Sequence, residues 1–188
     1  MSFKILDFQK VRDGKYLKNY EITYSNKAGK EKKYEMVSRR ELHSIEDVGA
    51  APSGVSIVAT CGDKLLLLHE FRMGVNRTIY NLCAGMLNDG ESIEDCIARE
   101  LYEETGLQIK KIRTILPPSF AAVAISDTTT YIAFAEVEGS FSDHSSENEQ
   151  IDARFYSREE VKELLETESF SSRAQMAAYF FAYHGYKI

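Results

Sequence analysis

Residues 85–107 read GMLNDGESIEDCIARELYEETGL, and the interpretation of the rest of the chain starts from this stretch. Ser92 followed three residues later by Asp95 is typical of a helix N-terminus, because the two side chains satisfy free backbone N–H groups. Gly106 provides the left-handed residue that commonly ends a helix. The spacing therefore predicts a helix over residues 93–105.

Glutamates gather on one face of this predicted helix. Glu100, Glu103 and Glu104 are neighbours there, because side chains three and four residues apart share a face, and their like charges repel. Ile97 and Leu101, which should face the core, lie close by on the helical wheel. A solvated acidic face is the alternative, but carboxylates beside a core are more typical of a cation site. Ligands that are all oxygens suit Mg²⁺ or Mn²⁺ better than Zn²⁺.

With Gly85, Glu91 and Arg99 added, the stretch resembles the Nudix box of the Nudix hydrolases at every defined position. In that family the box is a loop and helix that hold Mg²⁺ against the diphosphate of a nucleotide derivative, and water cleaves the phosphoanhydride. The resemblance implies that the three glutamates and the carbonyl of Ala84 are metal ligands. It also implies catalytic roles for Glu103 and Arg99, a close turn at Gly85, and a structural or more distant metal-binding role for Glu91.

The catalytic base is expected in a second stretch, residues 147–151, which reads ENEQI. This run resembles the bacterial ADP-ribose pyrophosphatases, in which a loop glutamate is the base. The resemblance implies Glu147 for this role, with Glu149 second. Composition alone indicates a solvated acidic loop.

Two further residues are candidates for binding the substrate. Arg72 follows a run of apolar residues, which predicts either a phosphate contact or a salt bridge with a box carboxylate. Asp127 ends a loop that contacts the substrate in the ADP-ribose pyrophosphatases; the glycines of that loop are absent here, and Asp127 keeps its acidic end.

Composition limits the classes of partner. The chain has 188 residues, 44% of them hydrophobic, and a net charge of −6, so one core is expected and nucleic acid and anionic membranes should be repelled. No apolar run approaches transmembrane length. The three cysteines, Cys61, Cys83 and Cys96, form no CxxC pair and are expected to be buried free thiols, which favours a reducing, cytoplasmic location.

The order of elements predicts an α/β protein. Residues 1–48 alternate polar and apolar side chains and should form antiparallel strands, and residues 49–188 should form the Nudix hydrolase domain. The resemblance implies an α/β/α sandwich around a mixed sheet, and a homodimer in which the N-terminal strands pack against the partner subunit. Pro117 and Pro118 are expected to end a short strand.

Near the C-terminus, a helix is expected over residues 172–184. Its stripe of Met176, Ala177, Phe180 and Phe181 lies at helical spacing, which is more often core than a cofactor site.

The resemblance implies a Mg²⁺-dependent enzyme, with Mn²⁺ as a possible substitute. It would hydrolyse a nucleoside diphosphate linked to another group, ADP-ribose or a nucleotide sugar first, giving a nucleoside monophosphate and a sugar phosphate. One alternative is a hydrolase of the same fold acting on a GDP-sugar, a dinucleotide or a nucleoside triphosphate. The other is a non-catalytic Nudix module that senses a nucleotide.

Overall fold

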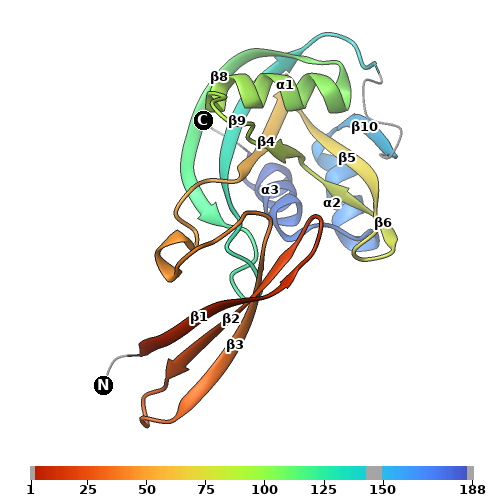
Figure 1. Ribbon diagram of the computed structural model, residues 1–188. Helices are drawn as coiled ribbons and strands as arrows, with labels where there is room; N and C mark the ends of the chain where they lie inside the picture. The colour runs from red at the N-terminus through yellow and green to blue at the C-terminus, as the bar shows by residue number, and fades with distance from the viewer. Residues whose placement is uncertain (1–2, 143–149, 186–188) are drawn as a thin grey trace. The chain divides into compact units, whose positions relative to one another are not determined.

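The computed structural model describes residues 3–142 and 150–185 (Figure 1). The strands, in chain order, are β1 (Lys4–Asp13), β2 (Lys18–Ser25), β3 (Glu31–Ser38), β4 (Gly54–Cys61), β5 (Lys64–Arg72), β6 (Arg77–Asn81), β7 (Cys83–Met86), β8 (Gln108–Phe120), β9 (Thr129–Glu138) and β10 (Ile151–Tyr156). The helices are the short 3-10 helix η1 (Ile45–Asp47) and the α-helices α1 (Ile93–Thr105), α2 (Arg158–Thr167) and α3 (Ser172–Tyr183).

The chain divides into two compact units, residues 1–53 with 118–130 and residues 54–117 with 131–188. The first unit contains the predicted antiparallel sheet, in the order β1-β2-β3. Tyr20 is its central core residue: the side chain is fully buried, the ring stacks on Phe8 at 5.0 Å, and the hydroxyl accepts a hydrogen bond from the Leu42 backbone N–H at 2.8 Å. A single aromatic residue thus joins the sheet to the segment that follows it.

The second unit is built on a larger sheet, in which β10, β5, β4, β9 and β8 are neighbours in that order, β6 pairs with β5 and β7 pairs with β4. Strand β5, which lies between β10 and β4, contains four consecutive buried leucines, residues 65–68. Successive strand residues point to opposite faces. Leu66 and Leu68 therefore pack with α1, whereas Leu65 and Leu67 pack with α2 and α3.

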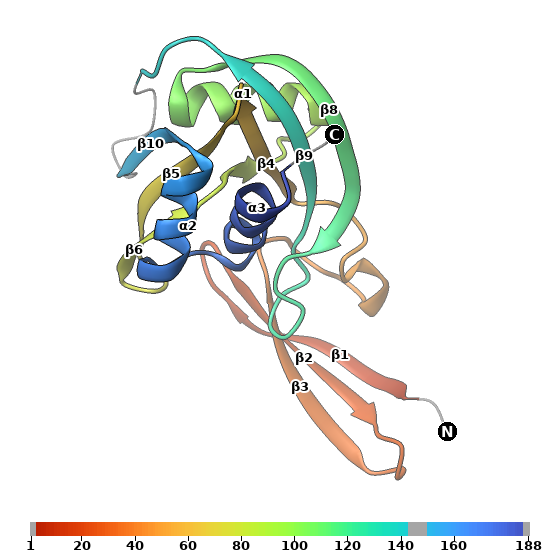
Figure 2. The ribbon, with the colours of Figure 1, turned by 180° about the vertical axis from the view of Figure 1, so that it is seen from behind.

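Helices accordingly cover both faces of this sheet. Figure 1 shows α1 in front of the strands, and Figure 2 shows α2 and α3 on the opposite face. This arrangement confirms the predicted α/β/α sandwich. Within the described residues, no helix is both long enough and apolar enough to cross a membrane.

The helix predicted over residues 93–105 is present with those boundaries. The Ser92 side chain accepts a hydrogen bond from the Asp95 backbone N–H at 3.1 Å, and Gly106 ends the helix with a φ of 75°. Ile97 and Leu101 are fully buried, as expected. Local capping signals and the core stripe therefore fix the helix that carries the glutamates.

The expected strand end at Pro117 and Pro118 is wrong, because β8 continues through both prolines to Phe120. β8 is the last strand in the order of its sheet. Proline lacks a backbone N–H and is tolerated where a strand has a neighbour on one side only.

The expected core stripe of α3 is also partly wrong. Phe181 is buried, but Met176 and Phe180 are 63% and 48% exposed. Small residues let the helix approach the sheet closely instead, and Ala174 and Ala178 are fully buried.

Candidate active site

Gly85 lies in β7, beside the helix face that carries the glutamates. A Cβ atom at this position would lie 1.7 Å from the carboxyl carbon of Glu100 and 1.9 and 2.0 Å from its two oxygens. Any side chain larger than hydrogen would therefore displace this carboxylate. The resemblance implied a close turn at Gly85, and the structure gives the glycine a different task, which is to leave room for Glu100.

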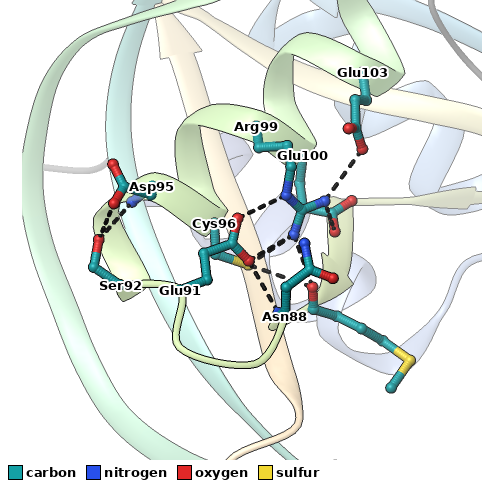
Figure 3. Close-up of polar contacts among 9 residues, drawn as sticks. Asn88, Glu91, Ser92, Asp95, Cys96, Arg99, Glu100 and Glu103 are labelled. Atoms are coloured by element: carbon teal, nitrogen blue, oxygen red, sulfur yellow. Dashed lines mark hydrogen bonds and ion pairs between the residues drawn. The ribbon is translucent and has the colours of Figure 1, made fainter.

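Arg99 joins the loop before α1 to the glutamates of the helix (Figure 3). Its Nε and Nη2 atoms donate to the two carboxylate oxygens of Glu91 at 2.7 and 2.9 Å, and this pairing lowers the pKa of Glu91 to about 2. Nη1 donates to Glu100 at 2.7 Å and to Glu103 at 3.2 Å. Nη2 also donates to the Met86 carbonyl at 2.9 Å. One guanidinium thus holds two of the three predicted metal ligands in place.

Glu104 is the most deeply placed of the three glutamates. Its carboxylate accepts hydrogen bonds from the Ala84 backbone N–H at 3.1 Å and from the Cys83 thiol. Burial raises the pKa of Glu104 to about 8 despite these hydrogen bonds, and the nearby charge of Glu100 adds to the rise. Burial also raises the pKa of Glu100. The charged form of Glu104 is therefore disfavoured, and Arg99 is the cation that pairs with Glu100.

The donor set fits a divalent metal ion. Among the residues that the structure describes, no three His, Cys, Asp or Glu side chains are already gathered tightly enough to hold one. The Glu100 side chain is 12% exposed and the Glu103 side chain 50%, so the face runs from the buried edge to solvent. Carboxylates with raised pKa values, such as those of Glu100 and Glu104, are hard oxygen donors that a cation would stabilise.

Sequence reasoning missed Glu70, a buried acid of β5 that is 5% exposed. It accepts hydrogen bonds from Asn81 Nδ2 at 2.6 Å and from Arg72 Nη1 at 3.3 Å. Arg72 is therefore ion-paired with Glu70, and the expectation of a salt bridge to a box carboxylate is wrong about the partner. The available signal was a charged residue in an otherwise apolar strand, LLLLHEF.

Of the other predicted residues, one is in the first unit and two are not described. Asp127 belongs to the first unit, where it is 4% exposed and lies 3.7 Å from the guanidinium of Arg40. The Gly49 backbone N–H also donates to its carboxylate at 3.5 Å. Glu147 and Glu149 lie outside the described residues.

A cavity of about 240 Å³ lies beside the box helix within the second unit. Glu104 is one of its lining residues, so the cavity adjoins the most buried of the predicted metal ligands. The lining residues are Glu104, Thr105, Phe141, Ser142, Ile151, Asp152 and Ala153.

Comparison with known families agrees with the geometry. The NUDIX domain matches residues 50–179 of this chain. The chain belongs to the NUDIX domain family. The box helix α1, its glutamates and β7 all lie inside the matched Nudix domain.

Individual relatives match parts of this chain. An ADP-ribose pyrophosphatase of Bacillus subtilis is 33% identical over 86 residues, 45% of this chain and 46% of that protein. One from Escherichia coli K12 is 27% identical over 125 residues, 62% and 59% of the two chains. An NAD-capped RNA hydrolase, NudC, of Vibrio parahaemolyticus is 54% identical over 57 residues, 30% of this chain and 22% of that protein. The chain thus spans less than two thirds of each of these relatives.

The fold also has a match among solved structures. A crystal structure of an ADP compounds hydrolase superposes with a TM-score of 0.74, covering 96% of this chain and 92% of that one. The two sequences are 22% identical, so this match bears on the fold alone.

Proposed function

We propose that this protein is a metal-dependent pyrophosphohydrolase that cleaves a nucleoside diphosphate linked to a second group. ADP-ribose is the first candidate, with a nucleotide sugar second, and the products would be a nucleoside monophosphate and a sugar phosphate. The observation that carries the proposal is the carboxylate face of α1, braced by Arg99 and packed against Gly85 in a Nudix domain. The names of the Bacillus and Escherichia relatives support the choice of ADP-ribose.

The ligands of the metal would be the carboxylates of Glu100, Glu103 and Glu104 and the carbonyl of Ala84. When bound, a divalent cation, Mg²⁺ or Mn²⁺, supplies positive charge to the diphosphate and makes a water molecule more acidic. Arg99 keeps Glu100 and Glu103 in position before the ion arrives. Ligands fixed in advance need little rearrangement during the reaction, which is the main source of electrostatic catalysis.

Two further tasks go to other residues of the chain. Glu147 is our candidate for the base that takes the proton from the attacking water, with Glu149 second, because both match the loop of the bacterial ADP-ribose pyrophosphatases. Arg72 is our candidate for a contact with the substrate phosphates, since its side chain is 57% exposed and its bond to Glu70 uses Nη1 of the guanidinium.

The first unit contains Asp127, our other candidate for a substrate contact. It contains a cavity of about 290 Å³ with two aromatic rings, several apolar side chains and the acid Asp127 on its walls. Aromatic rings stack on planar ligands such as a nucleobase, and the Asp127 side chain, which is 3% exposed and pairs with Arg40, forms part of the wall. The lining residues are Ile22, Tyr34, Met36, Val48, Phe120, Val123, Ser126 and Asp127.

Assembly and location complete the proposal. We infer a homodimer formed through the N-terminal strands, supported by the exposed apolar side chains Phe3, Ile5 and Val11, which are 58%, 44% and 54% exposed. We infer a cytoplasmic enzyme because the three cysteines are free.

Glu103→Gln tests the proposal. It should lower the rate of ADP-ribose hydrolysis in Mg²⁺ by about 100-fold while leaving the melting temperature unchanged, because a half-exposed carboxylate is lost and no packing changes. Glu94→Gln, an exposed glutamate on the same helix, is the matched control and should keep the wild-type rate. A Glu103→Gln variant as fast as wild type would exclude the metal assignment.

A substrate panel separates the remaining alternatives. If a GDP-sugar, a dinucleotide or a nucleoside triphosphate is hydrolysed faster than ADP-ribose, that compound is the substrate and the reaction is still hydrolysis of a phosphoanhydride. Tight nucleotide binding without turnover would indicate a sensing module. Glu147→Gln should slow hydrolysis and remove one limb of the pH profile, and an unchanged profile would exclude Glu147 as the base.

A further inference from the structure

Arginines gather at the end of the hairpin formed by β5 and β6. Arg72, the last residue of β5, lies directly across the antiparallel ladder from Arg77, the first residue of β6. Directly opposed residues of an antiparallel pair point to the same face, and like charges placed in this way destabilise the pair. The two guanidinium groups therefore repel each other, and this repulsion does not help the hairpin to fold.

The N-terminus of α3 is fixed beside this hairpin. The Ser171 backbone N–H donates to the Tyr80 carbonyl at 3.0 Å, and the Tyr80 N–H donates to the Ser169 carbonyl at 2.8 Å. The Ser171 hydroxyl donates to Asn81 Oδ1 at 2.6 Å, and Asn81 in turn donates to Glu70. A continuous hydrogen-bonded path thus links the first turn of α3 to the ion pair between Glu70 and Arg72.

A third arginine, Arg173, sits in this first turn of α3, where a cation opposes the helix dipole. Its side chain is partly buried, and within residues 3–142 and 150–185 no carboxylate lies within ion-pair distance of it. Burial and the neighbouring charge of Arg72 both lower the pKa of Arg173. Stability alone gives no reason for a cation in this position.

Among the described residues, the acid seen to pair with this cluster is Glu70, through Arg72. Glu70 is buried and already accepts hydrogen bonds from Asn81 and Arg72, so it cannot balance three guanidinium groups. The cluster therefore retains net positive charge. It also lies near the box, because Asn81, which donates to Glu70, is three residues before Ala84, whose backbone N–H donates to Glu104 at 3.1 Å.

We propose that Arg173 acts with Arg72 to bind a phosphoryl group of the substrate beside the metal-binding glutamates. Guanidinium groups match phosphate oxygens with paired N–H donors, and a bound phosphate would offset the repulsion among the three arginines. The identity of the ligand as the substrate rests on the proposed function, whereas the presence of a phosphate site rests on the arginine cluster itself. Carboxylates that take metal and arginines that take phosphate would then flank one diphosphate.

The test is the binding of inorganic pyrophosphate, in EDTA to exclude divalent metal, measured by calorimetry on the full chain. Arg173→Gln should weaken binding about tenfold, and Arg173→Lys should bind with intermediate affinity because it keeps the charge without the planar fork. Arg113→Gln, which removes an arginine of β8 that pairs with Glu136, is the control and should bind as wild type does. The melting temperature of unliganded Arg173→Gln should be unchanged or higher, because a repelled cation is removed.

A lower melting temperature with unchanged pyrophosphate affinity would show that Arg173 is structural and would overturn the inference. Wild-type protein that fails to bind pyrophosphate in EDTA would overturn it as well. The two proposals fail separately. If the wild type hydrolyses ADP-ribose and Arg173→Gln does so with an unchanged KM, the proposed phosphate site is wrong and the proposed hydrolase activity is confirmed. If pyrophosphate binding depends on Arg173 but no substrate is turned over, the proposed hydrolase activity is wrong and the proposed phosphate site is confirmed.

Discussion

The space left by Gly85 provides a sharp test of the site. In Gly85→Ala, the new Cβ would lie 1.7 Å from the Glu100 carboxyl carbon, where ordinary contacts begin at 3.4 Å. The carboxylate must retreat by more than about 1 Å, and a misplacement of that size commonly costs about 100-fold in rate. The retreat also lengthens the 2.7 Å hydrogen bond from Arg99. We therefore expect kcat/KM for ADP-ribose in Mg²⁺ to fall by about two orders of magnitude.

The fold should tolerate this change, because the clashing atoms are the end of a flexible side chain. We expect the free energy of unfolding, from urea titration, to change by no more than about 1 kcal/mol. Gly54→Ala is the matched control. Its Cβ would lie 2.0 Å from the Gly85 carbonyl oxygen, a backbone atom held in the pairing of β4 with β7, so stability should fall by about 1–3 kcal/mol or more.

A double variant shows whether Gly85 acts through Glu100. In a Glu100→Ala background the clash disappears, so adding Gly85→Ala should cost no further activity. The reasoning is refuted if Gly85→Ala keeps the wild-type rate, if it destabilises the protein as much as Gly54→Ala does, or if the two losses simply add.

Two further predictions concern titration and thiol reactivity. Because burial raises the pKa of Glu104 to about 8 from its ordinary 4.5, the metal-free folded protein holds a proton there that the unfolded chain has released. The contribution of Glu104 to the free energy of unfolding in EDTA should therefore be largest below pH 4.5 and should fall by a few kcal/mol as the pH rises to about 8. In Glu104→Gln this dependence of stability on pH should disappear. Iodoacetamide at neutral pH should label Cys61 alone in the folded protein and also Cys83 and Cys96 after unfolding, because Cys61 is exposed and burial raises the pKa of the other two thiols. Equal labelling rates for Cys61 and Cys83 in mass spectrometry would contradict the burial described here.

Local signals in the sequence were sufficient to predict the boundaries of the box helix. The Ser92 cap and the left-handed Gly106 act within one turn of the helix ends, so their effect depends little on the rest of the chain. Expectations that depended on neighbouring elements fared worse. The strand through Pro117 continues because β8 is a terminal strand of its sheet, and Cys61 is exposed because β4 ends there in a turn.

In the candidate site, too, local features could be predicted from the sequence and contacts between distant segments could not. The spacing of Glu100, Glu103 and Glu104 could be read from the sequence, because helical periodicity is a property of the chain alone. The pairing of Glu70 with Asn81 could not, because it joins residues of two strands whose register forms only on folding.

By itself, therefore, the sequence determined the box helix, its acidic face and membership of the Nudix family. These depend on short-range geometry and on a pattern contained in one stretch. Only the tertiary structure decided that Gly85 makes room for Glu100, that Glu104 is buried enough for its pKa to reach about 8, and that Arg173 stands near Arg72. Each of these depends on the packing of segments distant in sequence, and packing sets which charges lose water and which side chains have space.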